Sequence, residues 1–157
     1  MPCNDISNFS FEGGFDFWYP AAPNPSYTTA WVQSGDAYTG DKFLAVATTR
    51  DVPTGTVSQD LYWLDDEKPY ELTVHFRLVE PFGPVEGCTV SALLGDNEIA
   101  SDVVSAAGDW AALSGEITPP ERNMTLSLKA VCGFGKEMAD LQGQVWFDEV
   151  LFGPHCD

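Results

Sequence analysis

The chain has 157 residues, a length typical of one domain, and its 44% hydrophobic and 20% charged residues are ordinary for a globular protein. Its 7 basic and 24 acidic side chains give a formal net charge of −17, and a field of that sign repels nucleic-acid phosphates and anionic lipids. Apolar runs are far shorter than the roughly 20 residues that a membrane-spanning helix requires. We therefore expect one domain over residues 1–157 that binds no nucleic acid and does not insert into a membrane.

Most of the sequence has a period of two, which is typical of β-strands. Turn-forming residues separate the periodic segments, and no window predicts an amphipathic helix. About ten short strands in one domain predict an all-β fold, a jelly-roll β-sandwich of antiparallel strands. In chain order the predicted strands are Ser7–Phe11, Thr28–Val32, Lys42–Ala47, Thr56–Leu61, Tyr70–Val79, Cys88–Leu94, Glu98–Ser105, Trp110–Glu116, Met124–Cys132 and Gln144–Phe152.

The four cysteines, Cys3, Cys88, Cys132 and Cys156, show no Cys-x-x-Cys spacing, so neither a zinc ribbon nor a thioredoxin-like site is expected. Three disulfide pairings are possible. Cys88 and Cys132 have the core-facing parity of their strands and the other two lie near the chain ends, which favours Cys88–Cys132 and Cys3–Cys156. The alternative is four reduced cysteines. Two disulfides imply an oxidising compartment, so we expect a secreted, extracellular protein.

Two further features bear on the compartment. Glycosylation sequons at Asn8 and Asn123 agree with secretion. Asn123 lies between a Pro-Pro turn and a strand, where a glycan can be attached, whereas Asn8 abuts a predicted strand and can have a structural role. No signal peptide precedes Pro2, as expected of a mature form, an excised domain or an intracellular protein.

Aromatic residues are numerous enough to supply both a core and an exposed platform, with 10 Phe, 5 Tyr and 5 Trp. Carbohydrate binding depends on such platforms, because the C–H patches of a pyranose ring stack on an aromatic face. Trp18 and Tyr19 fall in a turn-rich stretch with no obvious core to enter, and Trp63 precedes the acidic run Asp65–Glu67. We expect these three side chains to contact carbohydrate. The remaining tryptophans, Trp31, Trp110 and Trp146, lie within strand-like segments.

The polar face of the strand over residues 70–79 is the second candidate ligand surface. Glu71, Thr73, His75 and Arg77 project from one side of it. If that face is concave, these side chains form a hydrogen-bonding floor for sugar hydroxyls, with His75 and Arg77 as ligand contacts. The alternative is an ordinary solvated face. Neighbouring strands add Thr89, Ser91, Ser127 and Lys129 with the same outward parity.

Catalytic motifs are not found in the sequence. There is no Gly-x-Ser-x-Gly elbow, no His-Glu-x-x-His zinc motif and no phosphate-binding glycine loop, and the two histidines are His75 and His155. Carboxylate pairs suited to glycoside hydrolysis can arise by chance among 24 acidic residues. We therefore expect no enzymatic activity.

Five segments together carry a resemblance to a known family. Asn8–Gly14 reads N-F-S-F-E-G-G, Gly40–Val46 reads G-D-K-F-L-A-V and Val57–Leu61 reads V-S-Q-D-L. Tyr70–Phe76 reads Y-E-L-T-V-H-F, and Val145–Phe152 reads V-W-F-D-E-V-L-F. In this order they resemble the strand motifs of jelly-roll carbohydrate-binding modules of the cellulose-, xylan- and glucan-binding type. The resemblance implies a galactose-binding-domain-like sandwich, and the cysteine placement is similar to that of fungal secreted members.

The resemblance also implies a structural Ca²⁺ ion between the first and last strands. Glu12 and Asp148 match the positions of ligating carboxylates, and backbone carbonyls near Ser10 and Lys42 would complete the shell. Alternatively, the two carboxylates are solvated at strand ends, or a lysine replaces the ion. Trp110 matches a tryptophan that commonly packs structurally in this family.

The fold alone does not decide between binding and structural roles, because this sandwich supports both. We expect a non-catalytic poly- or oligosaccharide-binding module that forms part of a larger secreted protein. The alternative is a structural or adhesion β-sandwich domain of an extracellular protein, without a sugar site. The exposure of Trp18 and Trp63 distinguishes the two, since a stacking platform must be accessible.

Overall fold

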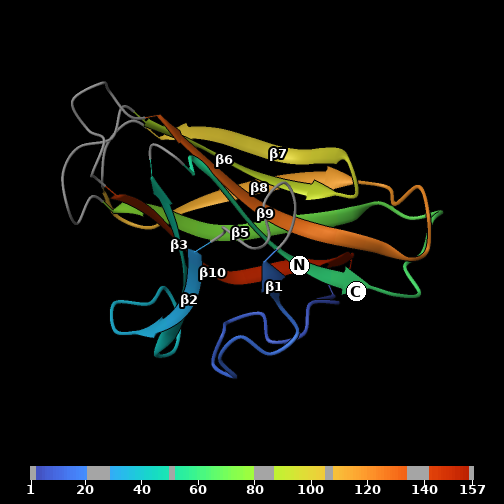
Figure 1. Cartoon of the computed structure of the whole chain (residues 1–157). Helices are drawn as coiled ribbons and strands as arrows, with labels where there is room; N and C mark the ends of the chain where they lie inside the picture. Colours follow the sequence, from blue (N-terminus) through green and yellow to red (C-terminus); the bar gives the residue numbers. More distant parts are fainter. Residues whose placement is uncertain are drawn as a thin grey trace.

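The computed structural model describes residues 3–20, 29–49, 52–79, 87–104, 108–133 and 142–155, and in these ranges it contains strands and turns. The strands form two layers whose ribbons overlap in the view of Figure 1, where β4 and β9 of one layer cross β5 and β10 of the other. No helix in the described ranges is long and apolar enough to cross a membrane. The strands are β1 (Tyr19–Pro20), β2 (Thr29–Ser34), β3 (Lys42–Thr49), β4 (Thr54–Leu61), β5 (Tyr70–Val79), β6 (Gly87–Leu94), β7 (Asn97–Val104), β8 (Ala111–Ile117), β9 (Met124–Gly133) and β10 (Gln142–Pro154).

Each layer is a five-stranded antiparallel sheet, which confirms the predicted all-β sandwich. One sheet has the order β1-β4-β9-β6-β7 and is called the β9 sheet below, after its central strand. The other has the order β2-β3-β10-β5-β8 and is called the β10 sheet. Neighbouring strands are often far apart in the sequence, so the long closing strand β10 lies between β3 and β5.

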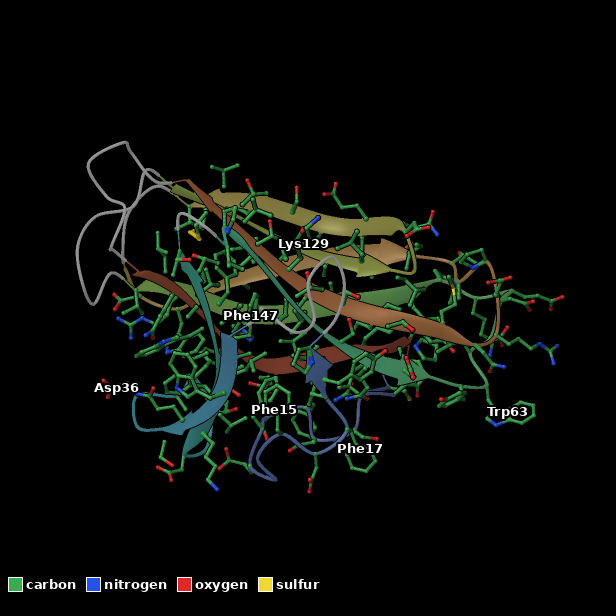
Figure 2. The ribbon with its side chains drawn as sticks, viewed as in Figure 1. Phe15, Phe17, Asp36, Trp63, Lys129 and Phe147 are labelled. Carbon is green, nitrogen blue, oxygen red and sulfur yellow. A yellow bond between two sulfur atoms is a disulfide. The ribbon has the colours of Figure 1, made fainter. Side chains whose placement is uncertain are left out.

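The core lies between the two sheets because alternate residues of each strand point inward. In β5 the even-numbered residues from Tyr70 to Leu78 are buried and the odd-numbered ones are half-buried on the outer side. Phe147 of β10, which pairs with Phe76 in the same sheet, is fully buried as well (Figure 2). Leu126 and Leu128 of β9 are fully buried in the other sheet. The period of two in the sequence therefore identified the core residues of these strands.

The predicted strand over Ser7–Phe11 is wrong, since this segment forms consecutive turns. Asn8 and Phe11 both have positive φ angles, of 51° and 61°. The Asn8 side chain holds the turn: its Oδ1 accepts from the Gly13 backbone N at 2.9 Å and its Nδ2 donates to the Gly14 carbonyl at 2.9 Å. Asparagine tolerates this left-handed conformation and competes with strand pairing through such local hydrogen bonds.

The start of the chain lies beside its closing strand. The backbone N of Cys3 donates to the Pro154 carbonyl at 2.7 Å, and that of Asp5 donates to the Phe152 carbonyl at 2.8 Å. Gly153 has no room for a side chain there, because the Cys3 backbone packs directly against it. The first residues thus run alongside the last part of β10 and bind its backbone before the turns begin.

Cys88 of β6 and Cys132 of β9 are directly opposite in the β9 sheet and form a disulfide with a Cα–Cα distance of 4.0 Å. This confirms the internal bridge predicted from strand parity. Cys3 is also disulfide-bonded. Its predicted partner, Cys156, lies outside the described residues.

Candidate functional site

The tryptophans expected to be platforms have opposite environments. Trp18 is 4% exposed, its ring centroid lies 5.2 Å from that of Phe11, and its Nε1 donates to the Asn8 carbonyl at 3.1 Å. Trp63 is 85% exposed and projects from one end of the sandwich (Figure 2). Trp18 as a ligand contact is therefore wrong, because the turns before it fold back and provide the core that the local sequence did not reveal.

Aromatic side chains gather instead on the outer side of the β10 sheet. The register places Trp31 of β2, Ala45 of β3, Trp146 of β10 and Arg77 of β5 side by side. Residues paired across strands share one side of a sheet, and here that side faces away from the core. Ala45 is 0% exposed, so its larger neighbours cover it. We call this surface the aromatic face, and it comprises Trp31, Tyr38, Phe43, His75, Arg77, Trp110 and Trp146.

The rings of the aromatic face are packed in layers. Phe43 is fully buried and its centroid lies 4.2 Å from that of Trp146, while Trp110 is 6.1 Å from Phe43 and 6.4 Å from Trp146. Above them, Tyr38 stacks on His75 with centroids 3.6 Å apart and an interplanar angle of 11°. Tyr38 is 43% exposed although His75 covers one side of its ring. Its other side is therefore accessible to a stacking partner.

Two buried polar atoms of this face, the Nδ1 of His75 and the Nε of Arg77, have no hydrogen-bond partner among the residues that the structure describes. Burial lowers the pKa of His75 even though the Glu149 charge and a hydrogen bond to the Glu149 backbone oppose the shift. The lowered pKa favours the neutral imidazole, in which the nitrogen bonded to the Glu149 backbone donates and Nδ1 is an acceptor. Arg77 lies with its guanidinium carbon 5.3 Å from the Trp146 ring centroid.

The acceptor and the donor are two residues apart on one strand, a spacing of about 7 Å. A buried polar group without a partner costs about 1–3 kcal/mol, so a ligand hydroxyl that displaces the side chains covering either atom and bonds to it recovers part of that free energy. His75 and Arg77 were both predicted as ligand contacts. The structure places them beside the rings of Trp31, Trp110 and Trp146, for which the sequence predicted only a position within a strand.

The rest of the predicted polar floor is divided between two surfaces. Thr89 and Ser91 of β6, with Ser127 and Lys129 of β9, lie on the outer side of the β9 sheet and not beside His75. The prediction of one continuous floor is therefore wrong. Parity along a strand distinguishes the inner from the outer side but does not say which sheet the strand joins.

The other two predicted ligand contacts lie away from the aromatic face. Tyr19 belongs to β1 and pairs with Ser58 of the β9 sheet. Trp110 of the aromatic face donates its indole N–H to the Asp36 carbonyl at 3.1 Å, so Asp36 marks the end of the molecule where Trp110 lies. Figure 2 shows Trp63 at the opposite end from Asp36. The structure therefore unites neither Tyr19 nor Trp63 with His75 and Arg77.

The predicted metal ligands form a separate site beside the loop between β2 and β3. The Glu12 carboxylate accepts from the backbone N of Asp41 at 2.8 Å and from that of Lys42 at 2.8 Å. Gly40 has a φ of +64°, and a side chain at this position would collide with the Glu12 carboxylate. The glycine therefore permits the loop to close on Glu12.

Asp148 is the second carboxylate of this site and is 0% exposed. Its oxygens accept from the backbone N of Thr39 at 2.9 Å and from that of Glu149 at 2.8 Å. Burial raises the pKa of Asp148 to about 6, and the nearby charge of Glu12 adds to the shift although these hydrogen bonds oppose it. A buried carboxylate next to another favours the arrival of a proton or a cation.

The chemistry of this site fits a hard cation. The charge of Glu12 acts on the Asp148 carboxylate, which accepts from the backbone N of Thr39, and the Thr39 Oγ1 is buried with no hydrogen-bond partner among the described residues. Ca²⁺ prefers such oxygen donors. Within the described ranges no three His, Cys, Asp or Glu residues are grouped to hold a metal, so hydroxyl or carbonyl oxygens, such as those predicted near Ser10 and Lys42, would be needed as well.

The structure also distinguishes the two sequons. The Asn8 Nδ2 donates to the carbonyls of Gly14 and Asp16, each at 2.9 Å. Asn123 is exposed, and its Oδ1 accepts from the Trp63 backbone N at 3.3 Å while its Nδ2 has no partner in the described part of the chain. Of the two, Asn123 presents the nitrogen that a glycan can occupy without loss of a hydrogen bond.

Neither a protein-family model nor a curated protein matches the sequence. Solved structures do resemble the described fold. TmCBM61 in complex with beta-1,4-galactotriose has a TM-score of 0.65 and 16% identity, over 98% of this chain and 99% of that one. The CBM22-1–GH10 modules of Clostridium thermocellum Xyn10B, complexed with xylohexaose, have a TM-score of 0.67 and 17% identity, over 100% of this chain and 29% of that one. This chain therefore has the two-sheet β-sandwich fold that these modules also have.

The same sandwich is also found in enzymes. A Stig cyclase from Fischerella sp. TAU has a TM-score of 0.66 and 20% identity, over 98% of each chain. Identities this low establish the fold and leave the function to the site. The resemblance noted in the strand motifs is thereby confirmed for the fold.

Proposed function

We propose that this chain binds a poly- or oligosaccharide non-catalytically on the aromatic face. The observation that carries the proposal is the juxtaposition of Tyr38, stacked on His75 with one side accessible, with the unpartnered polar atoms of His75 and Arg77. Aromatic rings provide the stacking surface and a few fixed polar groups select the hydroxyls, as expected of a sugar site.

Each residue has a distinct role in this arrangement. Tyr38 and Trp31 present partly exposed rings on which pyranose units stack. His75 accepts a hydrogen bond from a sugar hydroxyl at Nδ1, and Arg77 donates one from Nε. Phe43 and Trp146 form the packed layer beneath and hold these groups in place, since Trp146 contacts both Phe43 and the Arg77 guanidinium.

Tyr38→Ala and Trp31→Ala are each expected to weaken glycan binding by about 10-fold or more while the melting temperature changes little, because partly exposed rings contribute less to the core than to a ligand contact. A glycan array that includes xylohexaose and β-1,4-galactotriose identifies the best ligand. Isothermal titration calorimetry with that ligand then measures the affinity of each variant.

Trp63→Ala is the matched control, because it removes an equally large, more exposed ring at the opposite end of the molecule. It should leave the affinity unchanged. If Trp63→Ala abolishes binding and the Tyr38 variant does not, the sugar site lies elsewhere. If the folded wild type binds no glycan on the array, the structural or adhesion role replaces the binding role.

We further propose that Glu12 and Asp148 hold a structural Ca²⁺ ion. Support comes from two neighbouring carboxylates and an unpartnered Thr39 hydroxyl, all hard oxygen donors. The bound ion would offset the repulsion between the carboxylates and join the first turn to the closing strand. We also propose secretion, as part of a larger extracellular protein, because disulfides form in oxidising compartments.

Calcium is expected to raise the free energy of unfolding by about 2.7 kcal/mol at a free concentration of about 100 times its dissociation constant, since the unfolded chain cannot assemble residues 12 and 148. The effect is measured by thermal unfolding with calcium and after chelation, with metal analysis to confirm removal. Asp148→Asn should abolish the difference. An unchanged melting temperature after proven removal of the metal would contradict the site.

The pH dependence provides a second readout of the same site. In calcium-free protein the folded state binds a proton on Asp148 more tightly than the unfolded state, because its pKa is raised from 3.8 to about 6. The free energy of unfolding therefore increases by up to about 3 kcal/mol as the pH falls from above 6 to below 3.8, and this gain is lost again as the pH rises through 6. Calcium stabilisation should follow the opposite trend and be largest above pH 6.

A further inference from the structure

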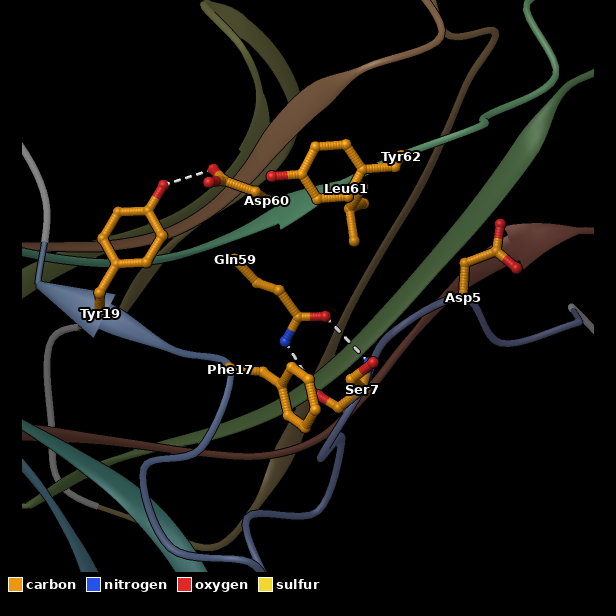
Figure 3. Close-up of a pocket in the computed structure, with 8 residues that line it drawn as sticks. All are labelled: Asp5, Ser7, Phe17, Tyr19, Gln59, Asp60, Leu61 and Tyr62. Carbon is orange, nitrogen blue, oxygen red and sulfur yellow. Dashed lines mark hydrogen bonds between the residues drawn. The ribbon is translucent and has the colours of Figure 1, made fainter.

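A pocket of about 460 Å³ lies at the β1–β4 edge of the β9 sheet (Figure 3). Strand β4 supplies one wall, and the turns between residues 5 and 19 supply the other. The aromatic face is on the outer side of the other sheet, so the two surfaces share no residue. We call it the edge pocket, and it is lined by Asp5, Ser7, Phe17, Tyr19, Gln59, Asp60, Leu61 and Tyr62.

Three aromatic rings of the edge pocket are accessible. Phe17 is 68% exposed, Tyr62 is 64% exposed and Tyr19 is 38% exposed. Phe17 also has a φ of 72°, a conformation that is unusual for a bulky residue and is maintained next to the buried Trp18. The Trp18 side chain therefore packs into the core while that of its neighbour Phe17 is exposed to solvent.

Two polar side chains of the edge pocket, Gln59 and Asp60, are held in place by hydrogen bonds. Gln59 is 3% exposed, and both ends of its amide bind the Ser7 backbone: the Ser7 N–H donates to Oε1, and Nε2 donates to the Ser7 carbonyl, both at 2.9 Å (Figure 3). Asp60 accepts at Oδ1 from the Tyr19 hydroxyl at 2.5 Å and from the Thr125 hydroxyl at 2.8 Å. The Oδ2 of Asp60 has no partner within the described residues.

Charge in the edge pocket has one sign. Asp5 and Asp60 are its ionisable carboxylic acids, and none of the lining residues is a lysine, arginine or histidine. Accessible rings next to carboxylates attract a cation, because the ring face carries partial negative charge and the carboxylate supplies an ion pair. The net charge of −17 increases the attraction over a longer range.

We propose that the edge pocket binds a protonated amine carried on an apolar ring surface, namely an amino sugar in a β-1,4-linked glucosamine oligomer. The pyranose C–H patches pack on Phe17 and Tyr62, and the ammonium group pairs with the free Oδ2 of Asp60. This inference goes beyond the proposed function, because it uses a second surface and a charged ligand class.

The test compares two tetrasaccharides by isothermal titration calorimetry, the tetramer of glucosamine at a pH where its amines are protonated and the fully N-acetylated tetramer. The glucosamine tetramer should bind at least about 10-fold more tightly, and its affinity should fall with added salt. Asp60→Asn, which keeps the Oδ1 acceptor for Tyr19 and Thr125, and Phe17→Ala should each weaken it by about 10-fold.

Asp66→Asn is the matched control, since it removes an equal charge from an exposed turn outside the pocket. Equal binding of the two tetramers, no binding of either, or equal losses for the Asp66 and Asp60 variants would each overturn the proposal. The same titrations are repeated in the Tyr38→Ala background, where the aromatic face is impaired, so that the loss caused by Asp60→Asn is assigned to the edge pocket. Failure at the edge pocket and failure at the aromatic face are therefore distinguishable.

Discussion

Trp18→Ala is expected to lower the free energy of unfolding by about 3–5 kcal/mol, the usual cost of removing a large aromatic from a core. The side chain is 4% exposed and packs on Phe11, which is fully buried. Its removal leaves a cavity and deprives the Asn8 carbonyl of its indole partner. Because the free energy of unfolding of a domain is about 5–15 kcal/mol, this single substitution removes a large part of it.

Urea unfolding followed by fluorescence measures the effect, with circular dichroism as a second probe because a tryptophan has been removed. Trp63→Ala should shift stability by no more than about 0.5 kcal/mol, as its ring is exposed. Trp18→Phe is the intermediate variant, which retains ring packing and loses the N–H donor. If Trp18→Ala leaves the unfolding midpoint unchanged, the N-terminal turns do not pack as described.

Trp18 is buried and Trp63 is exposed, and this difference shows what the sequence can and cannot predict. The alternation in β5 correctly identified Leu72 and Val74 as core, because a strand buried on one side imposes that pattern directly. The sequence around Trp18 contains only turn signals, and whether a turn folds back onto the core depends on contacts with distant residues. Phe11 and the Asn8 carbonyl provide those contacts here.

The aromatic face was missed for a related reason. His75 and Arg77 were identified from their own strand, but their neighbours come from β3, β10 and the loops beside them. A usable signal did exist, since Trp146 has parity opposite to the core residues Val145 and Phe147 and should therefore point outward. Strand pairing, which local periodicity does not encode, was needed to place it next to Arg77.

The two carboxylates proposed to bind calcium illustrate the value of motif resemblance. Composition supplies 24 carboxylates and no means of choosing among them. The motif order selected Glu12 and Asp148, and the structure brings these two close enough for the charge of Glu12 to raise the pKa of Asp148. Thr39 was not predicted, because its unpartnered hydroxyl is visible only once the β2–β3 loop covers Asp148.

Loss of the Cys88–Cys132 disulfide is the second large effect, and it is expected to cost up to about 4 kcal/mol of the free energy of unfolding. The two cysteines are 44 positions apart in sequence, and closing a loop of that length removes this much chain entropy from the unfolded state. In the folded state β6 and β9 already pair on either side of the bond, so it adds little native contact. The stabilisation therefore acts mainly on the unfolded chain.

Separate substitution is required, because a reductant would also act on the disulfide of Cys3. Cys88→Ala and Cys132→Ala should each cost nearly the full amount, and the double variant should cost little more, since the bond is lost at the first substitution. The urea midpoints of the wild type, the two single variants and the double variant, all measured without reductant, form the double-mutant cycle that tests this. Two small, additive losses of about 1 kcal/mol each would instead mean that only buried side-chain volume was removed and that the bond contributes nothing through the unfolded chain.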